Sequence, residues 1–536
     1  MIINDLAKIK KYRKSVIFWK NFKLIGFNPM QIKNPEKVVR IAVIATLSFM
    51  VCWGLVSVVA EVRPFWVDEW RIMYNLKFKS AAELWGPLDF MQQFPRVYMQ
   101  IVKVISGAFN YNYFGLRITS YIIGSFTILF CYRLMNKIFS PTHFNRFLFV
   151  MILISCSTFT LYYVQIKQYT MDMLLSVTAV WQLWELINSD TKNLRIRRYV
   201  LLCLSLLIVP FFSYIYPVAI APVFVVALVQ SIYILKDTNI EDKTRILVIK
   251  WFPLCLCAIS IGVFYIVDVS QLLQDKGMRR WWGPLLLDNG FNWNFFLYSI
   301  YNLFAEIGSG LVYWIIFGTL GTIAFFYSIY NAARNLYENK NIALCWLRLY
   351  SVLLLLFVFI LFLLKKLPVG EPRLNAFTIP SISILIISFL DQLKHKRAGN
   401  KISWGISVVL YLGLIGNIYT TFIAAITDPK YAKEMDIYRS TQKAIVLAQS
   451  NKIPIFITPG VAFPYDSTVN LPFNNTVPGD WVLKSFPAYC PTNRISVYPI
   501  NDLKDLENLK NIIDHLPHNI TEVLVGDGIA YHIIKR

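Results

Sequence analysis

Charged side chains are scarce in this sequence. Only 16% of its 536 residues are charged, whereas roughly a quarter are charged in an average soluble domain. Hydrophobic residues make up 56% of the chain, which leaves too little polar surface for water to be its main solvent. The apolar residues form blocks of about 20, long enough to cross a hydrocarbon layer of ~30 Å as helices. Because these runs are continuous and do not alternate with polar residues, they favour helices over a closed barrel.

Motifs that mark several common enzyme classes are also missing. There is no GxxxxGK(S/T) loop and no GxGxxG motif after a strand, so a cytoplasmic nucleotide site has no support. HExxH and CxxC zinc spacings do not occur, and we interpret His515 and His518 as a solvated loop pair rather than a metal site. No internal repeat of the kind expected for a transporter built from two halves is present.

Acidic residues are outnumbered by basic ones, 31 against 53, and the formal net charge is +22. The basic residues lie in short segments between apolar runs, which is typical of cytoplasmic loops. No basic run interleaved with aromatic residues forms a nucleic-acid face, so we exclude nucleic acid as a partner. The pattern predicts a multi-pass protein of the cell inner (plasma) membrane, with a cytoplasmic N-terminus and an extracytoplasmic C-terminus.

The predicted fold class is mainly α: a polytopic helical membrane protein with about eleven transmembrane helices and a small extracytoplasmic α/β domain. Its predicted parts are a basic cytoplasmic segment at 1–38, a transmembrane domain at 39–426 and the C-terminal domain at 427–536. The predicted spans are 39–60, 114–137, 145–163, 171–188, 198–214, 216–235, 246–268, 310–333, 345–366, 375–391 and 402–426.

The first outer loop, 61–113, contains the segment 96–112. Whether this segment crosses the membrane determines the side of the membrane on which every later loop lies. Counting this segment as a span would move every later basic loop outside, so we expect a helix at the outer interface. The C-terminal domain is expected to alternate strands with helices. Its predicted strands are 454–458, 495–498 and 522–525, and its predicted helices lie near 436–450 and 502–514.

Two adjacent carboxylates, Asp68 and Glu69, come shortly after the first span. Charged side chains at a membrane surface favour a functional site. They are equally typical of an ordinary helix start, because the helix dipole favours acidic residues in a first turn. Asp172, at the start of another predicted span, allows the same two interpretations, a functional carboxylate or a helix cap. Lys167 is either a binding residue or a lysine whose stem reaches toward the interface.

Several cations lie in loops that the charge pattern places outside, against the general bias. They are Lys276, Arg279, Arg280, Lys365, Lys366 and Arg373. Because the planar guanidinium of arginine matches phosphate oxygens, these residues predict a site for an anionic group at the outer face. Pairing with lipid headgroups, or with Glu371 and Asp275, is the alternative explanation.

Four motifs in order resemble those of the GT-C glycosyltransferases, in particular the bacterial relatives of protein O-mannosyltransferases and of the lipid A aminoarabinose transferase. Asp68-Glu69-Trp70-Arg71 is similar to the family's first-loop Asp-Glu-x-Arg, and Pro95 with Phe114-Gly115-Leu116-Arg117 is similar to its Pro…Phe-Gly-x-Arg segment. Tyr169-Thr170-Met171-Asp172 looks like the second-loop segment that ends in a carboxylate, and 368–373 looks like the Pro-x-Gly-x-x-Arg loop. The resemblance covers 40–190 and 368–380.

This resemblance implies an inverting transfer of a hexose or pentose from a polyprenyl phosphate to a lipid, glycan or protein acceptor at the extracytoplasmic face. No cofactor is expected to be required, although some relatives use a divalent metal. Asp68 is predicted to be the general base, with Glu69 and Asp172 positioning the sugar or the acceptor. The predicted substrate-binding and phosphate-binding residues are Arg71, Arg96, Lys167, Tyr169, Arg279, Arg280 and Arg373.

One position departs from the family pattern. In lipid A-modifying relatives a lysine that holds the donor phosphate stands just before the proline, whereas this chain has Phe94 there and Arg96 just after the proline. Either Arg96 takes the place of that lysine or phosphate binding moves to the other outer cations. A transporter or flippase of a lipid-linked or anionic substrate is the alternative function, although scarce mid-span charges disfavour it. A membrane scaffold is a further alternative, which leaves the carboxylates unexplained.

Overall fold

A computed structural model describes most of the helical part of the chain and short pieces of its C-terminal region. The longer described ranges are 35–60, 67–88, 92–139, 143–189, 195–236, 242–270, 292–305, 311–337, 343–369, 371–394 and 405–416. Leu286, residues 402–403, four strands and a few single residues beyond 440 are also described. The predicted N-terminal segment at 1–38 and the predicted C-terminal helices lie almost entirely outside these residues.

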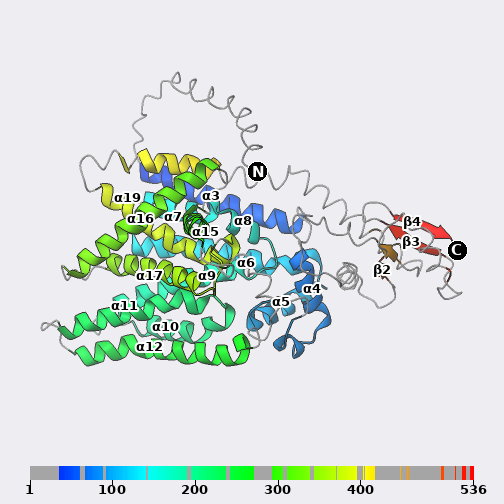
Figure 1. Cartoon of the computed structure of the whole chain (residues 1–536), viewed down its shortest axis with the longest axis horizontal. Coiled ribbons are helices and arrows are strands. Elements are labelled where there is room, and N and C mark those ends of the chain that lie inside the picture. Colours follow the sequence, from blue (N-terminus) through cyan, green and yellow to red (C-terminus); the bar gives the residue numbers. More distant parts are fainter. Residues whose placement is uncertain are drawn as a thin grey trace, which may run out of the picture.

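The N-terminal half of the described chain is a series of helices joined by short connections (Figure 1). Their bounds are α3 Pro35–Val59, α4 Val67–Phe78, α5 Arg96–Ala108, α6 Tyr113–Ile138, α7 His143–Ser155, α8 Ser157–Tyr162, α9 Tyr169–Asn188 and α10 Ile196–Ile208. Short 3-10 turns follow at Glu83–Trp85 and Val209–Phe212. The side chain of Asn112 caps α6 by accepting a hydrogen bond from the Gly115 amide at 2.7 Å, which is a common N-terminal cap.

The second half continues in the same way. Its elements are α11 Tyr216–Lys236, α12 Lys243–Phe264, a π-helical turn at Tyr265–Val269, α15 Trp293–Ala305, α16 Leu311–Tyr337, α17 Ala343–Leu363, α18 Pro372–Asn375, a 3-10 turn at Ala376–Thr378 and α19 Ile379–Lys394. A shorter apolar helix lies at Gly405–Gly416. Helix α9 packs between α6 and α11, and α17 packs against α11, α16 and α19, so the core of the bundle runs through α9 and α17.

Six of the described helices are long and apolar enough to cross a membrane. They are Tyr113–Ile138, Tyr216–Lys236, Lys243–Val269, Leu311–Asn335, Ala343–Leu363 and Pro372–Leu393. Each coincides with one of the predicted spans, so the chain is an integral membrane protein whose described part is mainly helical. The shorter apolar helices Ile44–Val59 and Gly405–Gly416 fall within the first and last predicted spans. The total of eleven spans stays a prediction.

Two predicted spans are interrupted. The span predicted at 145–163 consists of α7 and α8, which are separated at the extended residue Cys156. Serine and threonine residues surround this break, and their hydroxyl groups compete with backbone amides for carbonyl acceptors. The Ser155 hydroxyl, for example, donates to the Ile152 carbonyl at 3.1 Å. The span predicted at 198–214 ends its α-helix at Ile208, because Pro210 has no amide hydrogen to donate.

Different polar contacts mark the two ends of the helical bundle. At one end, the start of α4 contacts the start of α6, and Asp172 at the start of α9 accepts a hydrogen bond from Ser213. We call this the Asp68 end. At the opposite end, Lys137 of α6 pairs with Glu185 of α9 at 3.3 Å, and Lys250 of α12 donates to the Leu186 carbonyl at 2.5 Å. Figure 1 shows α4 and α5, in blue, at the Asp68 end.

A four-stranded mixed sheet lies in the C-terminal region and is drawn in brown and red in Figure 1. Its strands are β1 Ile455–Ile457, β2 Val497–Pro499, β3 Glu522–Gly526 and β4 Tyr531–Lys535, in the order β2-β1-β3-β4. Strand β1 is parallel to β2 and β3, whereas β3 and β4 are antiparallel. The first three strands overlap the predicted strands, and β4 was not predicted. The complete α/β domain stays a prediction, because its connecting segments lie outside the described residues.

Candidate functional site

The two adjacent carboxylates lie in the first turn of α4, where the positive end of the helix dipole favours them. Glu69 is completely buried. Its two carboxylate oxygens accept hydrogen bonds from Nε and Nη2 of Arg117 at 3.0 and 2.7 Å. The Arg117 guanidinium also donates to the Tyr113 hydroxyl and lies 4.3 Å from the centre of that ring. This two-bond carboxylate pairing fastens the start of α4 to the start of α6.

Glu69 also places the connection between α8 and α9. The Ile166 amide donates a hydrogen bond to Oε1 of Glu69 at 3.0 Å, which brings the next residue, Lys167, beside Asp68. The Lys167 ammonium lies 3.1 Å from Oδ2 of Asp68 and 3.3 Å from Oε1 of Gln92. Lys167 is buried and directed into the protein, so the interpretation of a lysine reaching toward the interface does not describe it.

Arg373 brings a second cation to Asp68 from much later in the chain. Its Nη1 lies 3.9 Å from Oδ2 of Asp68, and its Nε lies 2.6 Å from a carboxylate oxygen of Glu371. The loop before α18 is shaped by Asn375, whose amide donates to the carbonyls of Pro368, Val369 and Glu371 at 3.0, 2.9 and 2.9 Å. Both the functional interpretation of Arg373 and its pairing with Glu371 are therefore compatible with the structure.

Two tyrosines, Tyr162 at the end of α8 and Tyr169 at the start of α9, lie near Arg373. The rings of Tyr162 and Tyr169 meet edge to face with centroids 4.5 Å apart, and both interact electrostatically with Arg373. Tyr169 is within electrostatic range of Asp68 and of Asp172. Asp172 is buried and accepts a hydrogen bond from the Ser213 hydroxyl, whose oxygen accepts from the Ile215 and Tyr216 amides at the start of α11.

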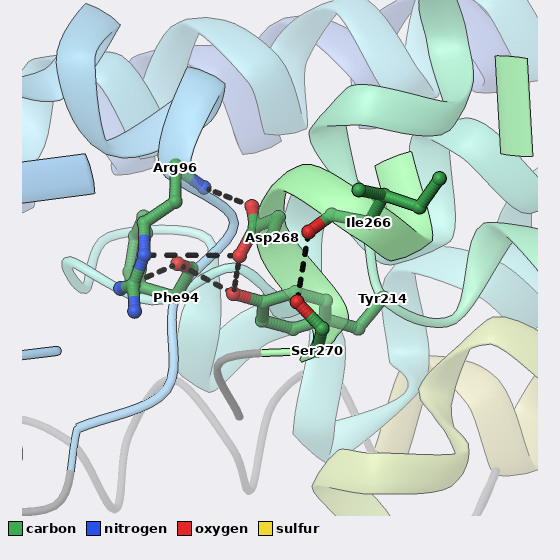
Figure 2. A network of polar contacts seen from close by, with 6 residues as sticks. All are labelled: Phe94, Arg96, Tyr214, Ile266, Asp268 and Ser270. Atoms are coloured by element: carbon green, nitrogen blue, oxygen red, sulfur yellow. Dashed lines mark hydrogen bonds and ion pairs between the residues drawn. The ribbon is translucent and has the colours of Figure 1, made fainter. Parts of the chain in front are cut away.

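Arg96 lies in a separate buried network, drawn in Figure 2. Its amide donates to Oδ2 of Asp268 at 2.8 Å, and its Nε lies 3.7 Å from Oδ1 of the same carboxylate. The Tyr214 hydroxyl lies 2.7 Å from Oδ1 of Asp268 and 3.0 Å from the Phe94 carbonyl. Phe94, at the position of the family's lysine, is buried and stacks on Tyr98 with centroids 5.1 Å apart. The structure thus pairs Arg96 with a carboxylate of its own chain.

Residues Arg96–Ala108 of the segment 96–112 form the helix α5, which contacts α4 through Lys103. The Lys103 ammonium donates to the carbonyls of Leu76 and Lys79 at 2.5 and 2.7 Å, at the C-terminal end of α4. Partial burial lowers the pKa of Lys103, and Glu83 opposes that shift. A lysine at a helix C-terminus satisfies carbonyls that have no partner within the helix. Lys103 therefore acts as a cap at the end of α4.

The structure brings three of the predicted site residues into one charged group: Asp68, Lys167 and Arg373. Asp172 accepts a hydrogen bond from Ser213, whereas Glu69 and Arg96 are held by Arg117 and Asp268. Arg279 and Arg280 lie outside the described residues, as does the side chain of Arg71.

Several residues of the site were not predicted as site residues: Gln92, Arg117, Tyr162, Ser213, Tyr214 and Asp268. Asp268 carried a usable signal, because it is an acidic residue near the end of a predicted span. Among the residues that the structure describes, no group of three or more His, Cys, Asp and Glu side chains is arranged to hold a metal ion.

The fold and the site together define a polytopic helical membrane protein with a group of opposite charges at one end of its bundle. Solved structures of similar architecture include ArnT from Cupriavidus metallidurans in the apo state, with 13% identity, a TM-score of 0.47, and 90% of this chain and 93% of that chain covered. The same ArnT bound to undecaprenyl phosphate has 10% identity, a TM-score of 0.48, and coverages of 92% and 97%.

The oligosaccharyltransferase of Archaeoglobus fulgidus, solved in complex with Zn and sulfate, is also similar, with 12% identity and a TM-score of 0.43 over 89% of this chain and 67% of that chain. No family model and no curated protein matches the sequence. These similar structures include the aminoarabinose transferase type that the sequence motifs resemble.

Proposed function

We propose that this chain is a membrane glycosyltransferase that transfers a sugar from a polyprenyl-phosphate donor to an acceptor hydroxyl at the extracytoplasmic face. The observation that carries this proposal is the contact of Asp68 with both Lys167 and Arg373, at 3.1 and 3.9 Å. Three distant segments of the chain thus meet at the Asp68 end of the bundle. A carboxylate and two cations in one place match a reaction that needs a base and a site for a phosphate leaving group.

In the proposed reaction, the Asp68 carboxylate takes the proton of the acceptor hydroxyl as that oxygen bonds to the anomeric carbon. The bond from the anomeric carbon to the phosphate oxygen breaks, and its electron pair stays on the released polyprenyl phosphate. One base without a nucleophilic partner implies inversion at the anomeric carbon. Glu69 is bound through both oxygens to Arg117, so we assign it the role of holding the loop beside Asp68.

Lys167 and Arg373 are proposed to bind the donor phosphate and to stabilise its growing charge. A guanidinium matches phosphate oxygens geometrically, and both cations lie in a site of low exposure, where electrostatic interactions are strong. Because a lipid anchor holds such a donor at the membrane, no nucleotide fold is needed, which agrees with the missing nucleotide motifs. Asp172 and Tyr169 are proposed to contact the sugar or the acceptor.

The proposal predicts that Asp68→Asn abolishes transfer, because the amide retains the size of the carboxylate but cannot accept the proton. The measurement is consumption of radiolabelled polyprenyl-phosphate sugars by the purified full chain in lipid vesicles. Glu185→Gln is the matched control, since Glu185 pairs with Lys137 at the opposite end of the bundle. Its activity should equal that of the unmodified chain.

Retained turnover in the Asp68→Asn variant would rule out this residue as the base. A transporter or flippase would move the lipid-linked sugar without consuming it, so the same assay separates these functions.

We also propose that no metal is required, because the two cations provide the positive charge. Addition of EDTA should leave the rate unchanged, and a rate that depends on added divalent cations would contradict this part.

A further inference from the structure

The buried carboxylate of Asp268 lies at the end of α12, in a π-helical turn that spans Tyr265–Val269. Such turns are rare and occur often at functional sites. The first residue of α5 is Arg96, whose amide has no partner within its own helix. Asp268 accepts this amide at 2.8 Å and pairs with the side chain of the same residue. The carboxylate therefore caps α5 from another helix, where the helix dipole also favours a negative charge.

Tyr214 completes the attachment from a third element. Its hydroxyl lies 2.7 Å from Asp268 and 3.0 Å from the Phe94 carbonyl, while its ring stacks on Phe264 with centroids 5.7 Å apart. Figure 2 shows the carboxylate between the hydroxyl of Tyr214 and the backbone of Arg96. The short segment from Phe94 to Arg96 is thus held at both of its ends, through the carbonyl of Phe94 and the amide of Arg96.

This segment leads directly to the charged group around Asp68. Gln92 lies two residues before Phe94, is buried, and accepts a hydrogen bond from Lys167 at 3.3 Å. Lys167 in turn lies 3.1 Å from Asp68. A continuous set of contacts therefore runs from Asp268 and Tyr214, through the backbone of 92–96, to the proposed base. Displacement of this backbone would move the Gln92 side chain away from Lys167.

We propose that Asp268 and Tyr214 are positioning residues, which hold the segment 92–96 so that Gln92 keeps Lys167 against Asp68. The importance of this role for transfer rests on the proposed function of Asp68. Under this proposal Arg96 has a structural role: its charge is balanced by Asp268, and it fixes the segment 92–96 instead of binding the donor phosphate. Lys167 and Arg373 then bind the phosphate. This is the second alternative from the sequence analysis, in which phosphate binding moves from the position of Arg96 to other outer cations.

The test measures the reactivity of Lys167, which does not require a known sugar donor. The full chain in lipid vesicles is treated briefly with an amine-acetylating reagent at fixed pH. Acetylation of Lys167 is then quantified by mass spectrometry relative to the exposed Lys366. Tyr214→Phe keeps the stacked ring and removes the hydroxyl. Loss of one such hydrogen bond should speed acetylation of Lys167 roughly fivefold, which corresponds to about 1 kcal/mol.

Three further variants make the result specific. Tyr350→Phe is the matched control, because its buried hydroxyl also donates to a backbone carbonyl, that of Ala219, at 3.0 Å in another part of the bundle. This variant should leave Lys167 unchanged. Asp68→Asn should speed acetylation by removing the ion pair, which shows that the assay reports on this contact. Asp268→Asn should act like Tyr214→Phe, because it removes the charge that holds Arg96.

A double-mutant comparison tests the route through Gln92. Gln92→Ala alone should speed acetylation of Lys167, and Tyr214→Phe should add little in that background. The proposal is overturned if Tyr214→Phe leaves Lys167 at its original rate, if Tyr350→Phe speeds it equally, or if the effects of Tyr214→Phe and Gln92→Ala multiply independently. Turnover in Asp68→Asn would overturn the proposed base but would not alter these acetylation results, so the two failures are distinguishable.

Discussion

Asp68 and Glu69 are neighbours in sequence but have different environments. Consecutive residues of a helix point about 100° apart, so two adjacent side chains cannot share one set of partners. Asp68 retains 20% exposure and meets two cations, whereas Glu69 is fully buried against Arg117. Only Asp68 therefore has both the exposure and the charged surroundings that a reacting group requires. Glu69 stabilises the structure that presents it.

The buried pair gives a prediction for stability. Arg117→Met should destabilise the fold by about 3–5 kcal/mol, because it leaves the Glu69 carboxylate buried without its cation. The measurement is the melting temperature of the detergent-solubilised chain. Lys137→Met is the control, since Lys137 is 45% exposed and its pair with Glu185 contributes roughly 0–1 kcal/mol. Equal melting temperatures for the two variants would contradict the assignment of Arg117.

At the scale of elements, the break between α7 and α8 has a direct consequence for the site. The chain turns at Cys156, and the short α8 carries Tyr162, whose ring meets that of Tyr169 edge to face with centroids 4.5 Å apart. The next residue, Tyr163, inserts its ring between α3 and α6, where Gly54 and Gly124 leave room for it. Its hydroxyl lies 2.7 Å from the Ser125 hydroxyl. An unbroken helix through this region would place these tyrosines differently.

The fit of Tyr163 predicts the effect of a single methyl group. In Gly124→Ala, the new Cβ would overlap the buried ring, which should cost roughly 1–3 kcal/mol of stability. Gly262→Ala is the matched control, because nothing lies within 4 Å of a Cβ at that helical position. There the change should be neutral or stabilising by about 0.5–1 kcal/mol. Melting temperatures of the two variants measure the difference, and a tolerated Gly124→Ala would disprove the tight packing.

Over the whole molecule, the two ends of the bundle differ in charge pattern. Lys137 and Lys250 lie at one end, next to stretches of sequence rich in basic residues, while Asp68, Asp172 and Asp268 lie at the other, together with the cations Lys167 and Arg373. Short basic loops face the cytoplasm in most membrane proteins, so the Asp68 end should face outward. A donor anchored in the outer leaflet would then reach the site without crossing the bilayer.

This orientation can be measured by cysteine labelling in intact cells. A cysteine in place of Lys366, which is exposed near the Asp68 end, should react with a membrane-impermeant maleimide added outside. A cysteine in place of Arg197, exposed at the other end, should react only after the cells are permeabilised. The unmodified chain provides the background from its native cysteines. The reverse pattern would invert the orientation and exclude an extracytoplasmic site.

The sequence by itself determined the helical membrane class and the positions of six long spans, and it predicted two of the cations that lie beside Asp68. These features depend on local runs of apolar residues and on charged residues near the ends of spans, which are visible without coordinates. Arg373 was predicted as a site residue because a cation in an outer loop needs a partner, and binding was one of the two interpretations given for Lys167. The predicted strands at 454–458 and 522–525 likewise overlap β1 and β3.

Only the tertiary structure decided which partner each charge takes. Asp268 lies 172 residues from Arg96, and no local pattern indicates that this carboxylate caps α5. The same holds for the pairing of Glu69 with Arg117, which depends on how α4 packs against α6. Hydrophobic periodicity places a helix in the membrane, but the direction of each polar side chain follows from the rotation and packing of its helix. That information is shared among distant segments and is therefore absent from any one of them.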